Sequence, residues 1–116
     1  MSTFKEKEIY LEIPEKYFKE ILYKLREFSK PIGDVYIAGA WNNWGDSPEK
    51  PGHIRLQEVN KMIKDGENFS IGLNLLPGIY EFKPVVVVAI PGKDGMVSGQ
   101  WISSPEGGNW ILTVIE

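Results

Sequence analysis

Short segments in which apolar and polar residues alternate recur along most of the chain, each bounded by glycine, proline, asparagine or aspartate. Residues 8–13 (EIYLEI) and 69–75 (FSIGLNL) alternate strictly. A period of two residues is typical of a strand with one buried face. The pattern predicts an all-β chain of about seven or eight short strands, folded as an antiparallel β-sandwich. Nine segments are candidates for these strands, and those at 54–59 and 62–64 are only short candidates: residues 8–13, 35–40, 54–59, 62–64, 69–75, 79–83, 85–90, 96–102 and 110–115.

One segment near the N-terminus has a helical period instead. Its apolar residues are Phe18, Ile21, Leu22, Leu25 and Phe28, and lysine and glutamate fill most of the positions between them. Pro14 suits the first turn of a helix, and Pro31 with Gly33 interrupts the chain beyond it. We therefore predict one amphipathic helix over about residues 14–29, inserted between the first two strands.

The segment from Val85 to Ile90 is apolar at every position. A sandwich strand normally exposes one face, so this run predicts that both of its faces are covered. We expect the amphipathic helix to cover the outer face, because its apolar stripe also needs a partner. A contact between two copies of the chain, or a protruding hairpin with its tip at residues 91–95, is the alternative.

Composition limits the class of protein. With 116 residues and 42% hydrophobic content, the chain is predicted to form a single domain over residues 1–116. A formal net charge of −3 and a pI near 5.2 argue against a nucleic-acid partner. The longest apolar run is too short to cross a membrane, and the N-terminal STFKEKE is charged where a signal peptide is apolar, so we expect a cytoplasmic protein with no membrane partner.

Enzymatic motifs are weak in this sequence, and we expect no catalytic site, metal or cofactor. There is no cysteine, and His53 is the single histidine, so a histidine or cysteine metal cluster cannot form. The acidic residues fall mainly on the predicted helix or at turns, where solvation explains them. The glycines of residues 91–95 and 107–108 lack the spacing of a phosphate-binding loop.

The four tryptophans are the main functional signal. Trp41 follows a strand directly and Trp110 opens one, so we predict that both rings point into the core. Trp44 and Trp101 lie among glycine and polar residues, in NNWGDS and SGQWISS, and are predicted to be exposed. An exposed indole face suits the apolar C–H face of a sugar ring. Side chains of Asn42, Asn43 and Asp46 are expected to fix the turn that carries Trp44.

Four segments resemble, in order, the family 48 carbohydrate-binding modules. They are VYIAGAWNNWGDSP, DGENFSIGLNLLPGIYEFK, GQWISSP and GNWILTVI, within residues 35–115. The family includes the glycogen-binding domain of the AMP-activated kinase β subunit and N-terminal modules of isoamylase, pullulanase and branching enzymes. The resemblance implies an immunoglobulin-like β-sandwich that binds α-1,4-glucans such as glycogen, starch or maltooligosaccharides. It assigns the sugar site to Trp44, Lys83, Trp101 and Asn109.

The chain also departs from that family. Trp41 replaces a phenylalanine, residues 84–98 form an extra stretch, and the segment between Trp101 and Asn109 is shorter than in the kinase modules. The helix between the first two strands is an addition. Two hypotheses therefore follow: a non-catalytic α-glucan-binding module, or a docking module of the same fold that pairs with a catalytic domain or subunit, or with itself.

Overall fold

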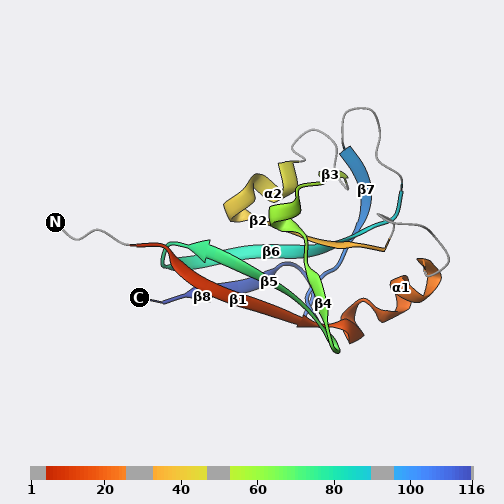
Figure 1. Cartoon of the computed structure of the whole chain (residues 1–116), viewed down its shortest axis with the longest axis horizontal. Helices are drawn as coiled ribbons and strands as arrows, with labels where there is room; N and C mark the ends of the chain where they lie inside the picture. Colours follow the sequence, from red (N-terminus) through yellow and green to blue (C-terminus); the bar gives the residue numbers. More distant parts are fainter. Residues whose placement is uncertain (1–4, 26–32, 47–52, 90–95, 116) are drawn as a thin grey trace.

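The computed structural model describes residues 5–25, 33–46, 53–89 and 96–115. Every strand pairing in these ranges is antiparallel, and a helix lies between the first two strands, as predicted (Figure 1). Within the described ranges no helix has the length and apolar character needed to cross a membrane. The elements in chain order are β1 (Lys7–Pro14), η1 (Glu15–Tyr17), α1 (Lys19–Leu25), β2 (Val35–Gly39), η2 (Ala40–Asn42), α2 (Asn43–Asp46), β3 (His53–Arg55), η3 (Glu58–Asn60), β4 (Ile63–Asp65), β5 (Asn68–Leu75), β6 (Gly78–Val87), β7 (Met96–Trp101) and β8 (Trp110–Val114).

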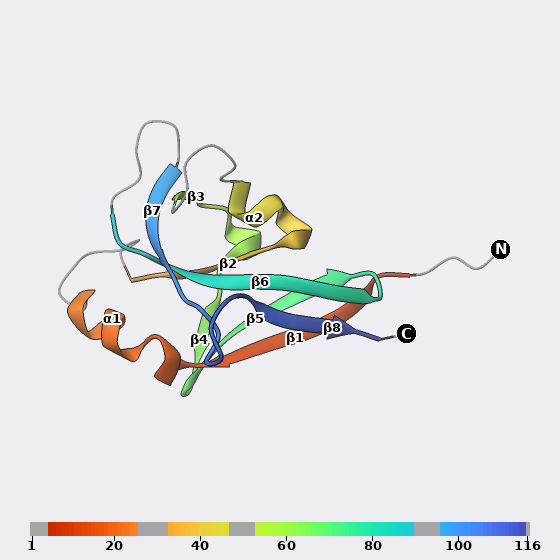
Figure 2. The ribbon, with the colours of Figure 1, turned by 180° about the vertical axis from the view of Figure 1, so that it is seen from behind.

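The strands form two sheets. One has the order β1-β5-β4, and the other has the order β2-β6-β7-β3, with β8 also paired to β6. The short connection at residues 76–77 carries the chain from β5 in the first sheet to β6 in the second. Figure 2 shows the same arrangement from behind. The two sheets enclose one core, which is the layer arrangement of a β-sandwich.

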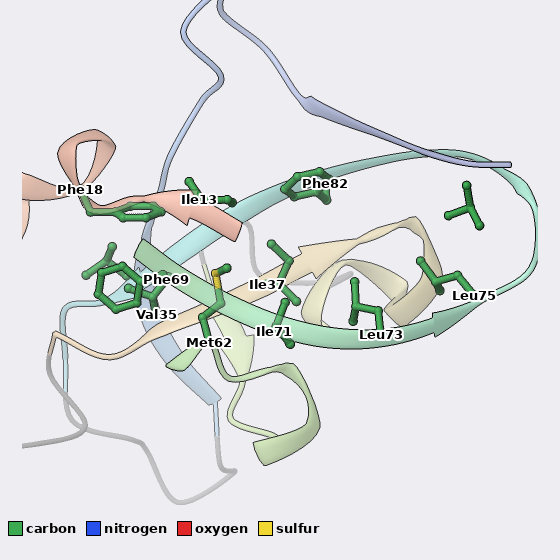
Figure 3. Close-up of a cluster of buried hydrophobic side chains, with 12 residues drawn as sticks. Ile13, Phe18, Val35, Ile37, Met62, Phe69, Ile71, Leu73, Leu75 and Phe82 are labelled. Carbon is green, nitrogen blue, oxygen red and sulfur yellow. The ribbon is translucent and has the colours of Figure 1, made fainter. Parts of the chain in front are cut away.

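The main core lies between the two sheets. β5 alternates as predicted from Ile71 onward, with Ile71, Leu73 and Leu75 buried and Gly72 and Asn74 exposed, whereas Ser70, predicted on the polar face, is buried. Figure 3 shows the side chains of β5 directed toward those of β2 and β6. The buried members of this core are Ile13, Phe18, Val35, Ile37, Met62, Phe69, Ile71, Leu73, Leu75, Phe82, Val86 and Val114.

Trp41 and Trp110 pack against this main core, as the sequence predicts. The Trp41 ring meets Tyr80 edge to face, with centroids 5.9 Å apart. The Trp110 ring stacks on Phe82 at 6.1 Å, and its Nε1 donates a hydrogen bond of 3.1 Å to the carbonyl of Ile102. Both rings therefore stabilise the fold from inside the sandwich.

The predicted helix is confirmed between β1 and β2, where η1 and α1 follow Pro14, while residues 26–29 of the prediction lie outside the described residues. Its apolar side packs on the main core. Phe18 has no exposed surface and meets Phe69 edge to face at 5.3 Å, and Leu22 and Leu25 pack beside it. The helix therefore contributes its apolar stripe to the core between the sheets.

The prediction that this helix covers the outer face of the Val85 segment is therefore wrong. Strand alternation directs Val86 into the main core and directs Val85 and Val87 outward. The outward pair is covered by side chains of β2, β3 and β7 and by Trp44. Residues 85–87 of the run do have cover on both faces, but the outer cover comes from the tryptophan turn and β3. The predicted hairpin tip at residues 91–95 lies outside the described residues.

Pro84 does not interrupt the sheet, although the sequence predicts two strands separated by it. β6 continues from Gly78 to Val87, with β2 paired along one edge over residues 82–86. On the other edge β8 pairs with residues 78–82 and β7 with residues 85–87. The carbonyl of Pro84 accepts a 2.9 Å bond from the amide of Ile102, so its nitrogen faces that same edge. Proline is tolerated here because its missing N–H lies on this edge of β6, at the point where the pairing with β8 ends and the pairing with β7 begins.

The position of Leu22 gives a testable prediction. We expect Leu22→Asp to lower the free energy of unfolding by about 2–4 kcal/mol, because it places a carboxylate against the main core. Urea unfolding followed by tryptophan fluorescence measures the change. Tyr23→Asp makes the same charge change at the next helical position, where the side chain is 63% exposed, and is expected to cost far less. An unchanged stability with a shift from dimer to monomer would show instead that Leu22 forms a contact between copies.

Candidate functional site

A second hydrophobic cluster lies on the outer face of the β2-β6-β7-β3 sheet. Register pairs Tyr36 with Val85, and Val85 with Trp101, so these side chains lie side by side. Burial raises the pKa of the Tyr36 hydroxyl, and the nearby carboxylates of Glu58 and Asp34 add to this, so the phenol is neutral at neutral pH. The buried members are Tyr36, Ala38, Ile54, Val85, Val87 and Val97, with Trp44, Leu56 and Trp101 packed against them.

Trp44 reaches this cluster from the turn that follows β2. It is the one non-glycine residue with positive φ in the described ranges, at φ 53° and ψ 46°, and Gly45 follows at φ 72°. A bulky residue rarely adopts this left-handed conformation, so its presence indicates a turn fixed by its surroundings. The short α2 segment is therefore a kinked turn and not a regular helix.

Two contacts hold the turn against the sheet. The side-chain oxygen of Asn42 accepts hydrogen bonds from the backbone amides of Gly39 and Gly45, at 2.9 and 3.1 Å. Gly45 is buried so closely on β3 that a Cβ atom would lie 2.8 Å from Cγ2 of Ile54. The predicted role of Asn42 in fixing the turn is confirmed, whereas the side chains of Asn43 and Asp46 lie outside the described residues.

The turn places the Trp44 ring on the Trp101 ring. Their centroids are 6.4 Å apart and their planes differ by 24°, which is a stacked pair. Both rings are half-buried and not fully exposed as predicted, because their inner faces rest on the second cluster. Nε1 of Trp101 is buried and has no hydrogen-bond partner among the described residues. Each ring keeps part of its surface exposed, and this stacked Trp44–Trp101 pair is called the aromatic platform below.

Lys83 and Asn109 lie next to this platform in the sheet. Lys83 is half-buried and pairs with Ala38, two residues along β6 from the Val85–Trp101 pair, and alternation gives it the same outer face. Asn109 directly precedes β8 and is half-buried. Because Phe82 pairs with Trp110, continuing the register by one residue puts Asn109 level with Lys83. The sheet thus brings all four sequence-predicted residues to one region.

A compact loop connects Trp101 to Asn109. Its backbone closes through Ser104, whose amide donates to the carbonyl of Gly108 at 3.0 Å and whose carbonyl accepts from Gly107 at 2.9 Å. Gly107 and Gly108 both have positive φ, which glycine adopts without a Cβ clash. The loop leaves the sheet beside Lys83, between the stretch of β6 that pairs with β7 and the stretch that pairs with β8.

Sequence reasoning missed the residues that support the platform. Gly99 approaches Val85 so closely that a Cβ atom would lie 2.2 Å from its Cγ1, and Ile54 fills the space beneath Gly45. Glycine within a strand is the signal that could have found the first contact. A hollow of about 680 Å³ lies elsewhere, bordered by α1, β4 and residues 33–35 and 61–62, and none of the four predicted residues lines it.

The groups of the platform and its neighbours suit a neutral, partly apolar ligand. Indole faces accept C–H surfaces, the Lys83 ammonium donates hydrogen bonds, and the Asn109 amide both donates and accepts. Among the described residues no group of three or more histidine, aspartate or glutamate side chains is arranged to hold a metal ion. The arrangement therefore offers recognition of a polyhydroxylated ring without requiring any reacting group.

No protein-family model matches the chain, and no curated protein matches it. The resemblance to family 48 modules therefore rests on the quoted motifs, and its functional consequences are proposals.

Proposed function

We propose that this chain is a non-catalytic α-glucan-binding module with the immunoglobulin-like fold of family 48 modules. The observation that carries the proposal is the stacked Trp44–Trp101 pair, which the strand register puts beside Lys83 on the outer face of the β2-β6-β7-β3 sheet. Glycogen, starch and maltooligosaccharides present sugar rings with apolar C–H faces and hydroxyl rims, which match indole faces and polar side chains respectively.

The energetics support a weak site. The two rings are half-buried before any ligand arrives, so a sugar chain covers little additional apolar area. A flexible chain also loses conformational freedom on binding. We expect an affinity of about micromolar to millimolar per site. Salt should change it little, because the ligand carries no charge.

Retardation of the folded chain in a native gel that contains amylopectin tests the proposal. We expect clear retardation relative to a gel without polysaccharide, and none for the denatured chain. With millimolar maltoheptaose, chemical-shift changes should centre on Trp44, Lys83, Trp101 and Asn109. The absence of both effects would leave the sugar site without support.

A second candidate is a docking module that pairs with a catalytic domain or subunit, or with itself. It is favoured by three exposed isoleucines, on β6, on β8 and directly after β8. Ile79, Ile111 and Ile115 are 73%, 58% and 73% exposed, and strand alternation puts them on the same outer face as Lys83. Exposed apolar groups that share one face often mark a protein interface. Ile79→Ser should leave glucan retardation unchanged but abolish self-association or capture of a catalytic partner if docking is the function.

A further inference from the structure

We propose that Asn42 is the positioning residue of the aromatic platform: its carboxamide closes the turn, holds Trp44 in the left-handed conformation and so aligns the Trp44 ring with Trp101. The effect on ligand binding rests on the proposed function, whereas the effect on ring alignment does not. Asn42 is half-buried beneath the platform and acts through the backbone on both sides of it.

Both the oxygen and the nitrogen of the Asn42 carboxamide form hydrogen bonds. Its oxygen accepts from the amides of Gly39 at 2.9 Å and Gly45 at 3.1 Å, and its nitrogen donates to the carbonyl of Ile37 at 2.9 Å. Ile37 and Gly39 belong to β2, which is paired to β6. One side chain thus ties the far end of the turn, at Gly45, to a strand of the sheet.

Trp44 directly precedes Gly45, the residue whose amide bonds the Asn42 side chain. With Asn42 bonded to Gly45 and with Gly45 pressed on Ile54, the backbone at residue 44 is fixed at both ends. A left-handed tryptophan is unfavourable by itself, so it persists only while these contacts hold it. Removing the carboxamide releases the Gly45 amide and lets Trp44 return to the more extended conformations that bulky residues prefer.

The effect on binding depends on the fraction of molecules in which Trp44 is aligned with Trp101. If only a fraction of the molecules holds Trp44 in line with Trp101, the apparent dissociation constant rises in inverse proportion to that fraction. A drop to about a tenth therefore weakens binding about tenfold. The stacked geometry, 6.4 Å between centroids and 24° between planes, is the state that Asn42 selects.

Nuclear magnetic resonance on the whole chain tests the positioning role without any ligand. In the parent, we expect cross-ring nuclear Overhauser effects between Trp44 and Trp101, and scalar couplings across the two hydrogen bonds from Gly39 and Gly45 to the Asn42 carboxamide carbon. Asn42→Ala should lose the cross-ring effects while the signals of β5 keep their dispersion. Asn42→Asp keeps an oxygen acceptor for both amides but loses the donor to the Ile37 carbonyl, and should retain these effects only in part. Asn74→Ala, an exposed asparagine on the other sheet, is the matched control and should change nothing.

A double-mutant cycle tests the link to binding. Asn42→Ala should weaken retention on amylopectin about tenfold in the parent and not at all in Trp44→Ala, because it acts through Trp44. Cross-ring effects that survive in Asn42→Ala would overturn the proposal. If Asn42→Ala does not fold, the scalar couplings in the parent decide, and their absence overturns it. A parent that shows the ring alignment but no retention refutes the proposed function and leaves the positioning role standing.

Discussion

Replacing Trp44 and Trp101 together by alanine is expected to abolish glucan binding. Each ring supplies one half of the platform, and central aromatic groups commonly contribute about 2 kcal/mol or more each to binding. Losing both moves an affinity of about micromolar to millimolar beyond the range of an affinity gel. The measurement is migration in amylopectin gels, with maltoheptaose titration by chemical shift as the second readout.

The structure requires a stability control for this experiment. Both rings rest on Val85 and its neighbours, so truncation uncovers the second cluster and is expected to lower the free energy of unfolding by about 1–3 kcal/mol per ring. Trp44→Phe keeps a ring at the same place and should retain part of the binding. Ile79→Ala lies on the same sheet face outside the platform and should leave binding unchanged. Normal retention by the folded double variant would contradict the sugar site.

Phe82→Ala is expected to have the largest effect on stability, about 3–5 kcal/mol of the free energy of unfolding. Phe82 is 2% exposed and lies between Trp41 and Trp110, with ring centroids 5.9 and 6.1 Å away. Truncation leaves a cavity at the centre of β6, where the core cannot collapse without moving both tryptophans. A domain with about 5–15 kcal/mol of stability would come close to unfolding.

Thermal and urea unfolding measure this effect. Glu81→Ala changes the preceding residue of the same strand, whose side chain is exposed, and is expected to stay within about 0.5 kcal/mol of the parent. If Phe82→Ala unfolds at the same urea concentration as Glu81→Ala, the ring does not occupy the core position described for it.

The strands and the helix were predictable because their signals are local. Alternation in residues 69–75 decides which side chains of β5 are buried, and Pro14 with the stripe around Leu22 decides where a helix follows. The partner of the helix was not predictable in this way. An apolar stripe predicts that the helix packs against another apolar surface, but it does not identify that surface. Here Phe18 packs in the main core and not on the outer face of Val85.

The residues of the site were found by motif, but their arrangement depends on contacts distant in sequence. The left-handed backbone of Trp44 follows from bonds to Asn42 and from close packing on Ile54. Neither feature is visible in the letters NNWG, which are equally compatible with a tryptophan in an ordinary turn. The continuity of β6 through Pro84 likewise depends on which edge the proline nitrogen faces, and only strand pairing decides that.

The exchange of partner strands along one edge of β6 has a consequence for how such a module can diversify. Because β7 and β8 each pair with their own stretch of β6, and the Ile102 amide still bonds Pro84 of that strand, residues 103–108 lie outside the strand pairings and close on themselves through Ser104. Insertions there would lengthen a surface loop at little thermodynamic cost. Residues gained in this way would rise beside Lys83 and change the reach and shape of the recognition surface. If the chain binds glucans as proposed, selectivity for short, long or branched chains can thus be tuned at this junction, while the scaffold that folds the molecule stays constant.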